Sequence, residues 1–399
     1  MIDRVYHLWL AGTLASQVGN AVLFFALGWA ASAEGGTAAA LVLTAVTLPR
    51  TLLMLLGGVA GDRLGARPVM IVCDALMVVV AVALGAVALG RGTPLPILVA
   101  AALVVGTVDA FYLPSSGSMP RRLVDDSRLS RAVALKQSGT QVVALVGGPI
   151  GGALVALGGF AVAAWFDAAT FAVVLVVLVA IRPRYDVPPP PSQESVLQSA
   201  RDGLRVAVRT PALGPALLLV AGAAGFILPT TTLLVPLLAR DHGWTAATAG
   251  LVVGAQGAGL ILATLVVARR GSAKRPGVAS AAGLVLAAAG QAGLVAPEAA
   301  LVAAVFVGVG SGVFVANLAP LLLGAAPRTH LARIQALVGV GQSAALVVTN
   351  NVLGMVAEVA SAGAAVLWCA VALAACAAGG LVTPALRRLT LHQAEAAGR

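Results

Sequence analysis

The chain has 399 residues, of which 60% are hydrophobic and only 10% are charged, and its formal net charge is +10. Its mean hydropathy of +0.99 is far outside the range of soluble globular proteins, which indicates an integral membrane protein. Cys73, Cys369 and Cys376 occur without CxxC spacing or a nearby histidine. The sequence therefore predicts neither a disulfide framework nor a metal site.

Apolar runs long enough to cross a hydrocarbon core, which takes about 20 helical residues, recur along the whole chain. The first run continues past any small-residue cleavage site, so we expect a membrane span there and not a removable signal peptide. We expect an all-α integral membrane protein with twelve transmembrane helices, at about 8–32, 38–60, 69–90, 95–118, 133–157, 160–181, 212–238, 246–268, 277–296, 299–325, 334–358 and 364–385.

Basic residues predict the orientation, because Lys and Arg collect in short cytoplasmic loops. With Lys136 counted as a loop residue, 22 of the 25 basic residues fall in the termini and the even-numbered gaps between spans. Only Arg91 and Arg240 fall in odd-numbered gaps, and Arg50 lies inside a span. We therefore expect a multi-pass protein of the cytoplasmic membrane with both termini in the cytoplasm. The positive charge is spread over loops without aromatic interleaving, which argues against a nucleic-acid partner.

Two loops suggest an internal duplication. LSRAVAL (129–135) and LARIQAL (331–337) share Leu, Arg, Ala and Leu at an offset of 202 residues, about half the chain. This offset predicts two pseudo-symmetric six-helix bundles, at 1–182 and 211–399, since transporters are often duplicated in this way. The polar segment 183–210 between them contains four successive prolines at 188–191 and then arginines at 201, 205 and 209. We expect a cytoplasmic linker with a basic amphipathic helix that lies on anionic lipid.

The segment GVAGDRLGARP (58–68) falls in the predicted loop between the second and third spans and resembles the signature loop of the major facilitator superfamily. Further segments resemble the branch of that family with macrolide-efflux and enterobactin-exporter proteins: LWLAGTLASQVGN (8–20), LPRTLLMLLGGVAGDR (48–63), YLPSSGSMPRRLV (112–124), GGPIGGAL (147–154), WFDAATF (165–171) and ARDGLRVAVRTP (200–211). The resemblance implies a twelve-helix, proton-coupled exporter that works by alternating access.

The signature loop suggests a cytoplasmic gate, to which we assign Gly61, Asp62, Arg63, Gly65, Arg67 and Asp74. We expect Asp62 to rest against the start of the eleventh span, near Arg333, because a helix N-terminus attracts an anion. Arg63 and Arg67 are expected to pair with Asp125 or Asp126 in the next loop, or with Asp74. The two glycines would allow a sharp turn and close helix approach. The alternative is a solvated turn that only satisfies the charge topology.

Ionisable groups inside spans usually mark a pathway or a pair, since each is costly at mid-membrane. Arg50 and Asp109 lie at matching depths, about 18 and 21 Å below the outer helix ends at 1.5 Å per residue. We expect them to pair if their helices are neighbours, either as the proton-exchange site or as a structural ion pair. Asp167 is a weaker candidate for the proton path. Asn20 stands where many similar exporters carry an aspartate, and an amide cannot exchange protons.

The fifth span contains Gly148, Pro149 and Gly152, which resemble the GPxxGG signature of antiporters, with Ala153 in place of the last glycine. Ordinary tight helix packing is the alternative explanation for these small residues. Gln137 and Gln141, one turn apart on the same helix, are expected to offer hydrogen bonds to a cavity.

Few aromatic and charged residues remain for a substrate cavity, so we expect a small hydrophobic or amphipathic substrate. We also expect a monomer in contact with membrane lipids, and no cofactor beyond a proton gradient. A solute importer or uniporter of the same fold is the main alternative. An enzyme or a receptor is less favoured, because the four histidines all lie outside the predicted spans.

Overall fold

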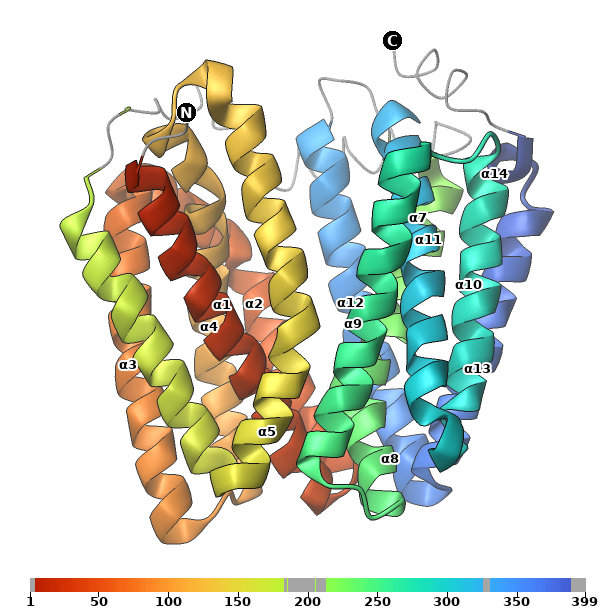
Figure 1. Cartoon of the computed structure of the whole chain (residues 1–399), viewed down its shortest axis with the longest axis horizontal. Helices are drawn as coiled ribbons and strands as arrows, with labels where there is room; N and C mark the ends of the chain where they lie inside the picture. The colour runs from red at the N-terminus through yellow and green to blue at the C-terminus, as the bar shows by residue number, and fades with distance from the viewer. Residues whose placement is uncertain (1–3, 183–184, 186–204, 206–212, 326–330, 389–399) are drawn as a thin grey trace. The chain divides into compact units, whose positions relative to one another are not determined.

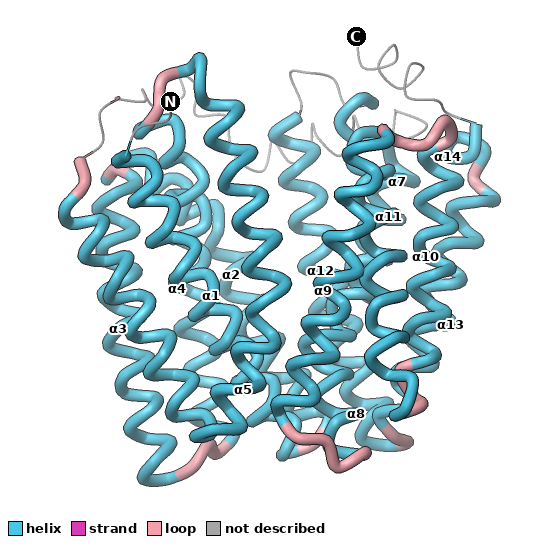
Figure 2. The backbone as a smooth tube through the Cα atoms, in the orientation of Figure 1, coloured by secondary structure: helices cyan, strands magenta, loops and turns pink. Residues whose placement is uncertain are grey.

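The computed structural model of the chain describes residues 4–182, 185, 205, 213–325 and 331–388. Every regular element within these residues is a helix (Figures 1 and 2). The chain forms two compact units: Met1–Ser192 with Gly243–Gly254, and Gln193–His242 with Ala255–Arg399. The predicted linker helix lies outside the described residues, apart from Arg205.

Each of the twelve predicted spans corresponds to a helical segment. Ten helical stretches of the described chain are long and apolar enough to cross a membrane. One of them, α5 (Asp126–Ala180), contains both the fifth and sixth spans, joined at Gly158 and Gly159. Gly159 has a φ of 69°, a conformation that glycine adopts without steric cost. The ninth span is α10 (Pro276–Gly293), which has 18 residues. The chain is therefore a multi-pass membrane protein with the expected all-helical fold.

In the first unit, α1 (Arg4–Ala31) packs along α5, and α2 (Gly36–Leu64) packs along α4 (Leu95–Leu123). The short helix η1 (Ser32–Glu34) joins α1 to α2, and α3 (Ala66–Arg91) packs on α5 and α4. Glycines allow α2 and α4 to touch through their backbones. A β-carbon on Gly106 would lie 2.1 Å from the Val46 carbonyl oxygen, and one on Gly57 would lie 2.0 Å from that of Ala110.

The second unit begins with a helix that changes its pitch. α7 (Leu213–Pro229) continues as the π-helical turn η2 (Thr230–Leu234) and then as α8 (Val235–Asp241). The remaining elements, with bounds, are α9 (Ala246–Arg270, of which the first residues belong to the first unit), α10, η3 (Pro297–Ala299), α11 (Ala300–Ala325), α12 (Leu331–Val359), α13 (Ala362–Val382) and α14 (Pro384–Arg388).

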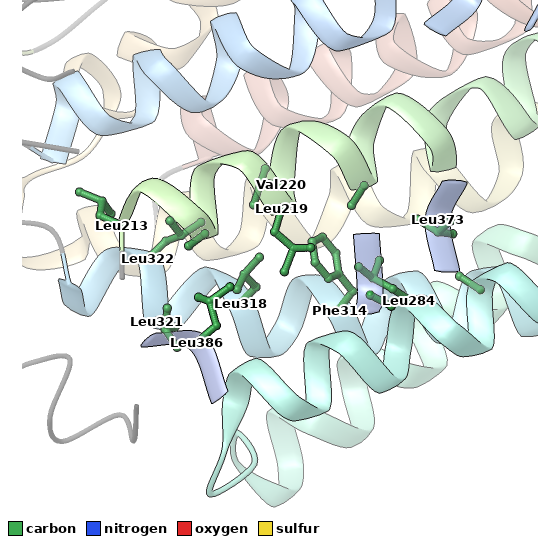
Figure 3. Packing of buried hydrophobic residues seen from close by; sticks show 14 of the residues in the cluster. Leu213, Leu219, Val220, Leu284, Phe314, Leu318, Leu321, Leu322, Leu373 and Leu386 are labelled. Atoms are coloured by element: carbon green, nitrogen blue, oxygen red, sulfur yellow. The ribbon is translucent and has the colours of Figure 1, made fainter. Parts of the chain in front are cut away.

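A cluster of large aliphatic side chains and one aromatic ring fills the centre of the second unit (Figure 3). Leu219 of α7, Leu284 of α10 and Phe314 of α11 meet there, and Leu373 of α13 closes the cluster. Each of these side chains is at most 6% exposed. Within the described part of this cluster no ionisable side chain other than the thiol of Cys376 is present, which matches the apolar C-terminal spans predicted from the sequence.

Candidate functional site: a charged cluster inside the first unit

An ion pair joins α2 and α4 in the interior of the first unit. Nη1 of Arg50 lies 4.0 Å from Oδ2 of Asp109, and their side chains are 28% and 13% exposed. The structure thus brings together the two residues that the sequence placed at equal depth. The glycine contacts between α2 and α4 explain how the pair is held, because they bring the two helix backbones into contact.

Two further helices contribute polar groups to this cluster. The side-chain amide of Asn20, on α1, lies within interaction range of the Asp109 carboxylate. Asp167, in the second half of α5, is fully buried, and neither of its carboxyl oxygens has a hydrogen-bond partner. Its carboxyl packs on Gly19, where an added β-carbon would lie 2.7 Å from Oδ1. Asp167 and Asp109 are within electrostatic reach of each other.

This arrangement has a definite chemical capability. Asp109 has a cation and an amide to stabilise its charge, whereas Asp167 has neither, and a buried carboxyl without a partner favours its neutral form. Protonation of Asp109 would remove the attraction that holds Arg50. The cluster can therefore hold one or two protons and can change its internal pairing when a proton arrives.

The signature segment forms a helix end and not the loop that the sequence predicted. α2 continues to Leu64, so Gly61, Asp62 and Arg63 lie in its last turns. Gly65 alone separates α2 from α3, with a φ of 90°. Gly61 faces α4, where an added β-carbon would lie 2.9 Å from Oγ of Ser115. Asp62 and Arg63 are exposed, and the latch between Asp62 and the eleventh span stays a prediction.

The expected partners of Arg67 and Asp74 were wrong. Arg67 donates from Nε to the Leu178 carbonyl at 2.7 Å and from Nη2 to the Val179 carbonyl at 2.9 Å. It thus binds the C-terminal end of α5, whose last carbonyls lack helical partners. Asp74 is fully buried and both of its oxygens lack hydrogen-bond partners.

Asp125, which was expected to pair with Arg63 or Arg67, has local partners instead. Its Oδ2 lies 3.4 Å from Nε of Arg128, and its Oδ1 accepts a hydrogen bond from the Ser127 hydroxyl. The hydrogen bond from Ser127 is the main cause that lowers the pKa of Asp125, and Arg128 adds to it. Ser127 and Arg128, two and three positions along the chain, thus bind this carboxylate in place of a distant arginine.

The glycines of the fifth span pack against the first turns of α9, which belong to the same unit. A β-carbon on Gly152 would lie 2.4 Å from the Ala246 carbonyl oxygen, and one on Gly148 would lie 2.5 Å from Cγ1 of Val253. Pro149 faces Gly254 in the same contact. The small residues therefore allow the two helices to touch closely, as both interpretations of this motif require.

Gln137 and Gln141, which were expected to offer hydrogen bonds to a cavity, both lie on α5 but differ in exposure. The side chain of Gln137 is exposed and that of Gln141 is half-buried. Between them, the Thr140 hydroxyl donates to Oε1 of Gln17 at 3.1 Å. This face of α5 therefore carries several groups able to form hydrogen bonds.

Lys136 was counted as a loop residue, but it lies inside α5 and is half-buried. Its Nζ donates to the carbonyl and to the hydroxyl oxygen of Ser116, at 2.9 and 3.2 Å, and lies 5.5 Å from the centre of the Trp9 ring. The sequence signal was available, because Trp9 near the start of the first helix offers a cation–π partner at the same depth.

Gln291 in the second unit was also missed. Its side-chain amide donates to the Phe226 carbonyl at 2.6 Å and to the Thr230 hydroxyl at 2.7 Å. The Cys369 thiol donates to the same carbonyl. These bonds satisfy a carbonyl that lies one turn before the π-helical segment, and π-helical turns often occur at functional sites. The sequence hint was the run of three threonines directly after Pro229.

Membrane-length helices in two compact units, with an ion pair among the helices of one unit, define a polytopic membrane protein. The Major Facilitator Superfamily family model matches residues 9–350, and the chain belongs to this family.

The chain is 27% identical over 266 residues to the "Multidrug efflux pump Tap" of Mycolicibacterium fortuitum, which covers 62% of this chain and 65% of that protein. The matched region thus spans just under two thirds of the relative. Among solved structures, the nucleoside transporter NupG matches with a TM-score of 0.70 at 14% identity, over 96% of this chain and 99% of that one. A D-xylose-proton symporter matches with a TM-score of 0.69 at 13% identity, over 96% and 99% of the two chains. The solved structures show the shared fold.

Proposed function

We propose that this protein is a proton-coupled exporter of a small hydrophobic or amphipathic molecule, working by alternating access in the cytoplasmic membrane with both termini in the cytoplasm. The observation that carries the proposal is the Arg50–Asp109 pair, held inside the first unit with Asn20 on one side and the unpartnered carboxyl of Asp167 nearby. The relative from Mycolicibacterium fortuitum, named a multidrug efflux pump, supports the direction of transport.

Proton binding is coupled to conformational change because a proton and Arg50 compete for the Asp109 carboxylate. While Asp109 is ionised it attracts Arg50, and the cluster stays closed. A proton on Asp109 cancels that attraction, so Arg50 becomes free to move toward water or toward substrate, and a second conformation gains population. The proton gradient can drive transport only if the two conformations expose Asp109 to opposite sides of the membrane. Asp167 is the second carboxyl of this path.

The substrate class follows from what the cavity can offer. The chain has three Tyr and five Trp in 399 residues, and only 10% of its residues are charged. Such a composition favours apolar contact over the many fixed hydrogen bonds that recognise a sugar or an amino acid. Gln137, Gln141 and Asn20 would supply the few polar contacts. We propose a monomer without a cofactor, surrounded by membrane lipids and without a nucleic-acid partner.

The gate belongs to the same proposal. Asp62 is exposed at the end of α2, where it is free to approach a helix N-terminus. An anion at such a terminus is stabilised by about 0.3 to 1 kcal/mol when exposed, and by up to about 2 kcal/mol when partly buried. We propose that this contact forms when the cytoplasmic side is closed and breaks when it opens.

The decisive experiment measures the transport of a panel of lipophilic dyes by purified protein in liposomes, with and without a pH gradient. Asp109→Asn keeps the shape of the side chain and removes its proton, so we expect gradient-driven transport to be lost while dye exchange without a gradient remains. Asp126→Asn, an exposed carboxyl on the same unit, is the matched control and should transport as the native protein does. Native, gradient-driven rates in Asp109→Asn would overturn the proposal.

An importer or uniporter of the same fold is the second candidate, since the solved structures with this fold include a nucleoside transporter and a sugar symporter. The same liposomes separate the candidates. An exporter moves dye against its gradient out of the compartment that faces the chain's termini, and it does so in exchange for protons. Downhill transport that a pH gradient does not alter would favour the uniporter.

A further inference from the structure

A second group of polar side chains is buried in the first unit, and its members lack partners. Asp74 on α3 is 0% exposed, and both of its carboxyl oxygens are without a hydrogen bond. The Thr13 hydroxyl on α1 and the Tyr112 hydroxyl on α4 are also buried and unpartnered. Three helices of the first unit therefore carry buried polar groups without hydrogen-bond partners. None of these groups belongs to the Arg50–Asp109 cluster.

Tyr112 is the link between these groups. Its hydroxyl is within interaction range of Thr13 and Ser16 on α1 and of Asp74 on α3. The Ser16 hydroxyl donates to the Thr13 carbonyl at 3.0 Å, and the Tyr112 hydroxyl itself has no hydrogen-bond partner.

The titratable groups near Asp74 are Cys73 on its own helix and Tyr112 on α4. Cys73 is also within electrostatic reach of Asp109. Among the described residues no cation pairs with Asp74, because Arg67 is bound to α5.

The energetics favour a protonated Asp74 with water beside it. An ionised carboxylate without a partner is strongly disfavoured in an apolar interior, so the group neutralises instead. A buried water needs two to four polar partners. The two oxygens of Asp74 and the hydroxyls of Tyr112 and Thr13 supply that number.

The helix register connects this region to the charged cluster. Tyr112 follows Asp109 by three residues on α4, so their side chains lie on one face about one turn apart. Asp74 is the ninth residue of α3, about 12 Å from the start of that helix at 1.5 Å per residue. Asp109 leads on to Asp167 through their electrostatic contact. Asp109 is thus within electrostatic reach of Asp167, and Tyr112, one turn along α4, is within electrostatic reach of Asp74.

We propose that Asp74 is a second proton-binding site, which exchanges protons with Asp109 through the Tyr112 hydroxyl and internal water. In each step one proton moves. Asp74, protonated at rest, first releases its proton toward the end of the unit where α3 begins. Asp109 then gives its proton to water, Tyr112 accepts a proton from that water on its oxygen and donates its own, and the ionised Asp74 takes up that proton. This inference rests on the proposed proton coupling and assigns its exit.

The charge state of Asp74 is measurable without a substrate. In infrared spectra of the purified full chain in lipid nanodiscs, the native protein minus Asp74→Asn should show the stretching band of one protonated carboxyl. That band should shift in heavy water, because the proton exchanges with internal water, and it should shift again in Tyr112→Phe. Asp126→Asn is the control and should remove ionised-carboxylate bands instead. Loss of carboxylate bands in Asp74→Asn would overturn the proposal, as would a band that heavy water leaves unchanged.

Transport supplies the second readout. Asp74→Asn and Tyr112→Phe should slow gradient-driven dye transport by about tenfold, less than the ~10²-fold typical of a positioned acid–base group, since water can partly replace them. Dye exchange without a gradient should stay near native, whereas a merely structural defect would lower both rates together. Native coupling in Asp74→Asn overturns this inference and leaves the proposed function standing. Native coupling in Asp109→Asn overturns the proposed function, and the infrared result for Asp74 then stands by itself.

Discussion

Nη1 of Arg50 and Oδ2 of Asp109 lie 4.0 Å apart on two helices, α2 and α4, whose backbones touch. Gly57 of α2 lies against the backbone of Ala110, and Gly106 of α4 lies against the backbone of Val46. Long side chains on separate, mobile elements lose entropy when they pair, whereas here the packing of the helices fixes most of the distance. A small shift of α2 along α4 would break the pair, which makes it sensitive to conformational change.

Arg50→Met should destabilise the protein, because it leaves the Asp109 charge without its cation. We expect a loss of about 2 kcal/mol, less than the ~3–5 kcal/mol of a fully buried pair, since the Arg50 side chain is 28% exposed. The double variant Arg50→Met/Asp109→Asn should recover most of this loss. Unfolding transitions in detergent measure both.

The control for that series is the exposed pair of Arg128 and Asp125, whose side chains are 49% and 37% exposed. Arg128→Met should change stability by about 0.5 kcal/mol or less. If the double variant Arg50→Met/Asp109→Asn is as unstable as Arg50→Met alone, the Asp109 charge is needed for another contact.

The sequence predicted the helices and their number because the membrane imposes a long, uniform apolar pattern. It also predicted the pairing of Arg50 with Asp109, since equal depth on neighbouring helices leaves few other partners for two costly charges. The junction inside α5, at Gly158 and Gly159, falls in the gap between the expected fifth and sixth spans, 133–157 and 160–181.

The failures have a common physical cause. The expected pairing of Arg67 with Asp74 was based on charge alone. In the structure Arg67 binds two backbone carbonyls at the end of α5 instead. Which helix end lies beside α3 is a property of the tertiary packing and leaves no local signal. Lys136 was counted with the loop because of its charge, although it falls inside the expected fifth span, and α5 extends farther still, to Asp126.

The α2–α4 contact can be tested with a matched pair of glycines on α4. Gly106→Ala places a methyl group against the Val46 carbonyl, where an added β-carbon would be 2.1 Å from the oxygen. We expect a loss of about 1 to 3 kcal/mol from this overpacking, together with weaker gradient-driven transport. Gly117→Ala meets no atom within 4 Å and should stabilise the helix by about 0.5 to 1 kcal/mol. Equal melting temperatures for the two variants would contradict the contact.

Arg67 should stabilise the end of α5 through geometry as well as charge. Its Nε and Nη2 bind two successive carbonyls, an arrangement that the single amine of lysine cannot reproduce. We expect Arg67→Ala to cost about 1 to 2 kcal/mol and Arg67→Lys to recover less than half of it. Hydrogen exchange at Leu178 and Val179 measures the fraying of this helix end directly. Full recovery in Arg67→Lys would show that only the charge matters.

The contact between α5 and the first turns of α9 allows a compensation test. Gly148→Ala brings a methyl group against Val253, whose Cγ1 would lie 2.5 Å from the new carbon. Overpacking of this kind costs about 1 to 3 kcal/mol, and we expect a lower melting temperature with slower transport. Val253→Ala makes room at the same spot, so the double variant Gly148→Ala/Val253→Ala should recover most of both losses. Because the two substitutions touch each other, their effects should be non-additive. Additive losses in the double variant would show that Gly148 is needed for helix bending at Pro149 and not for close approach to α9.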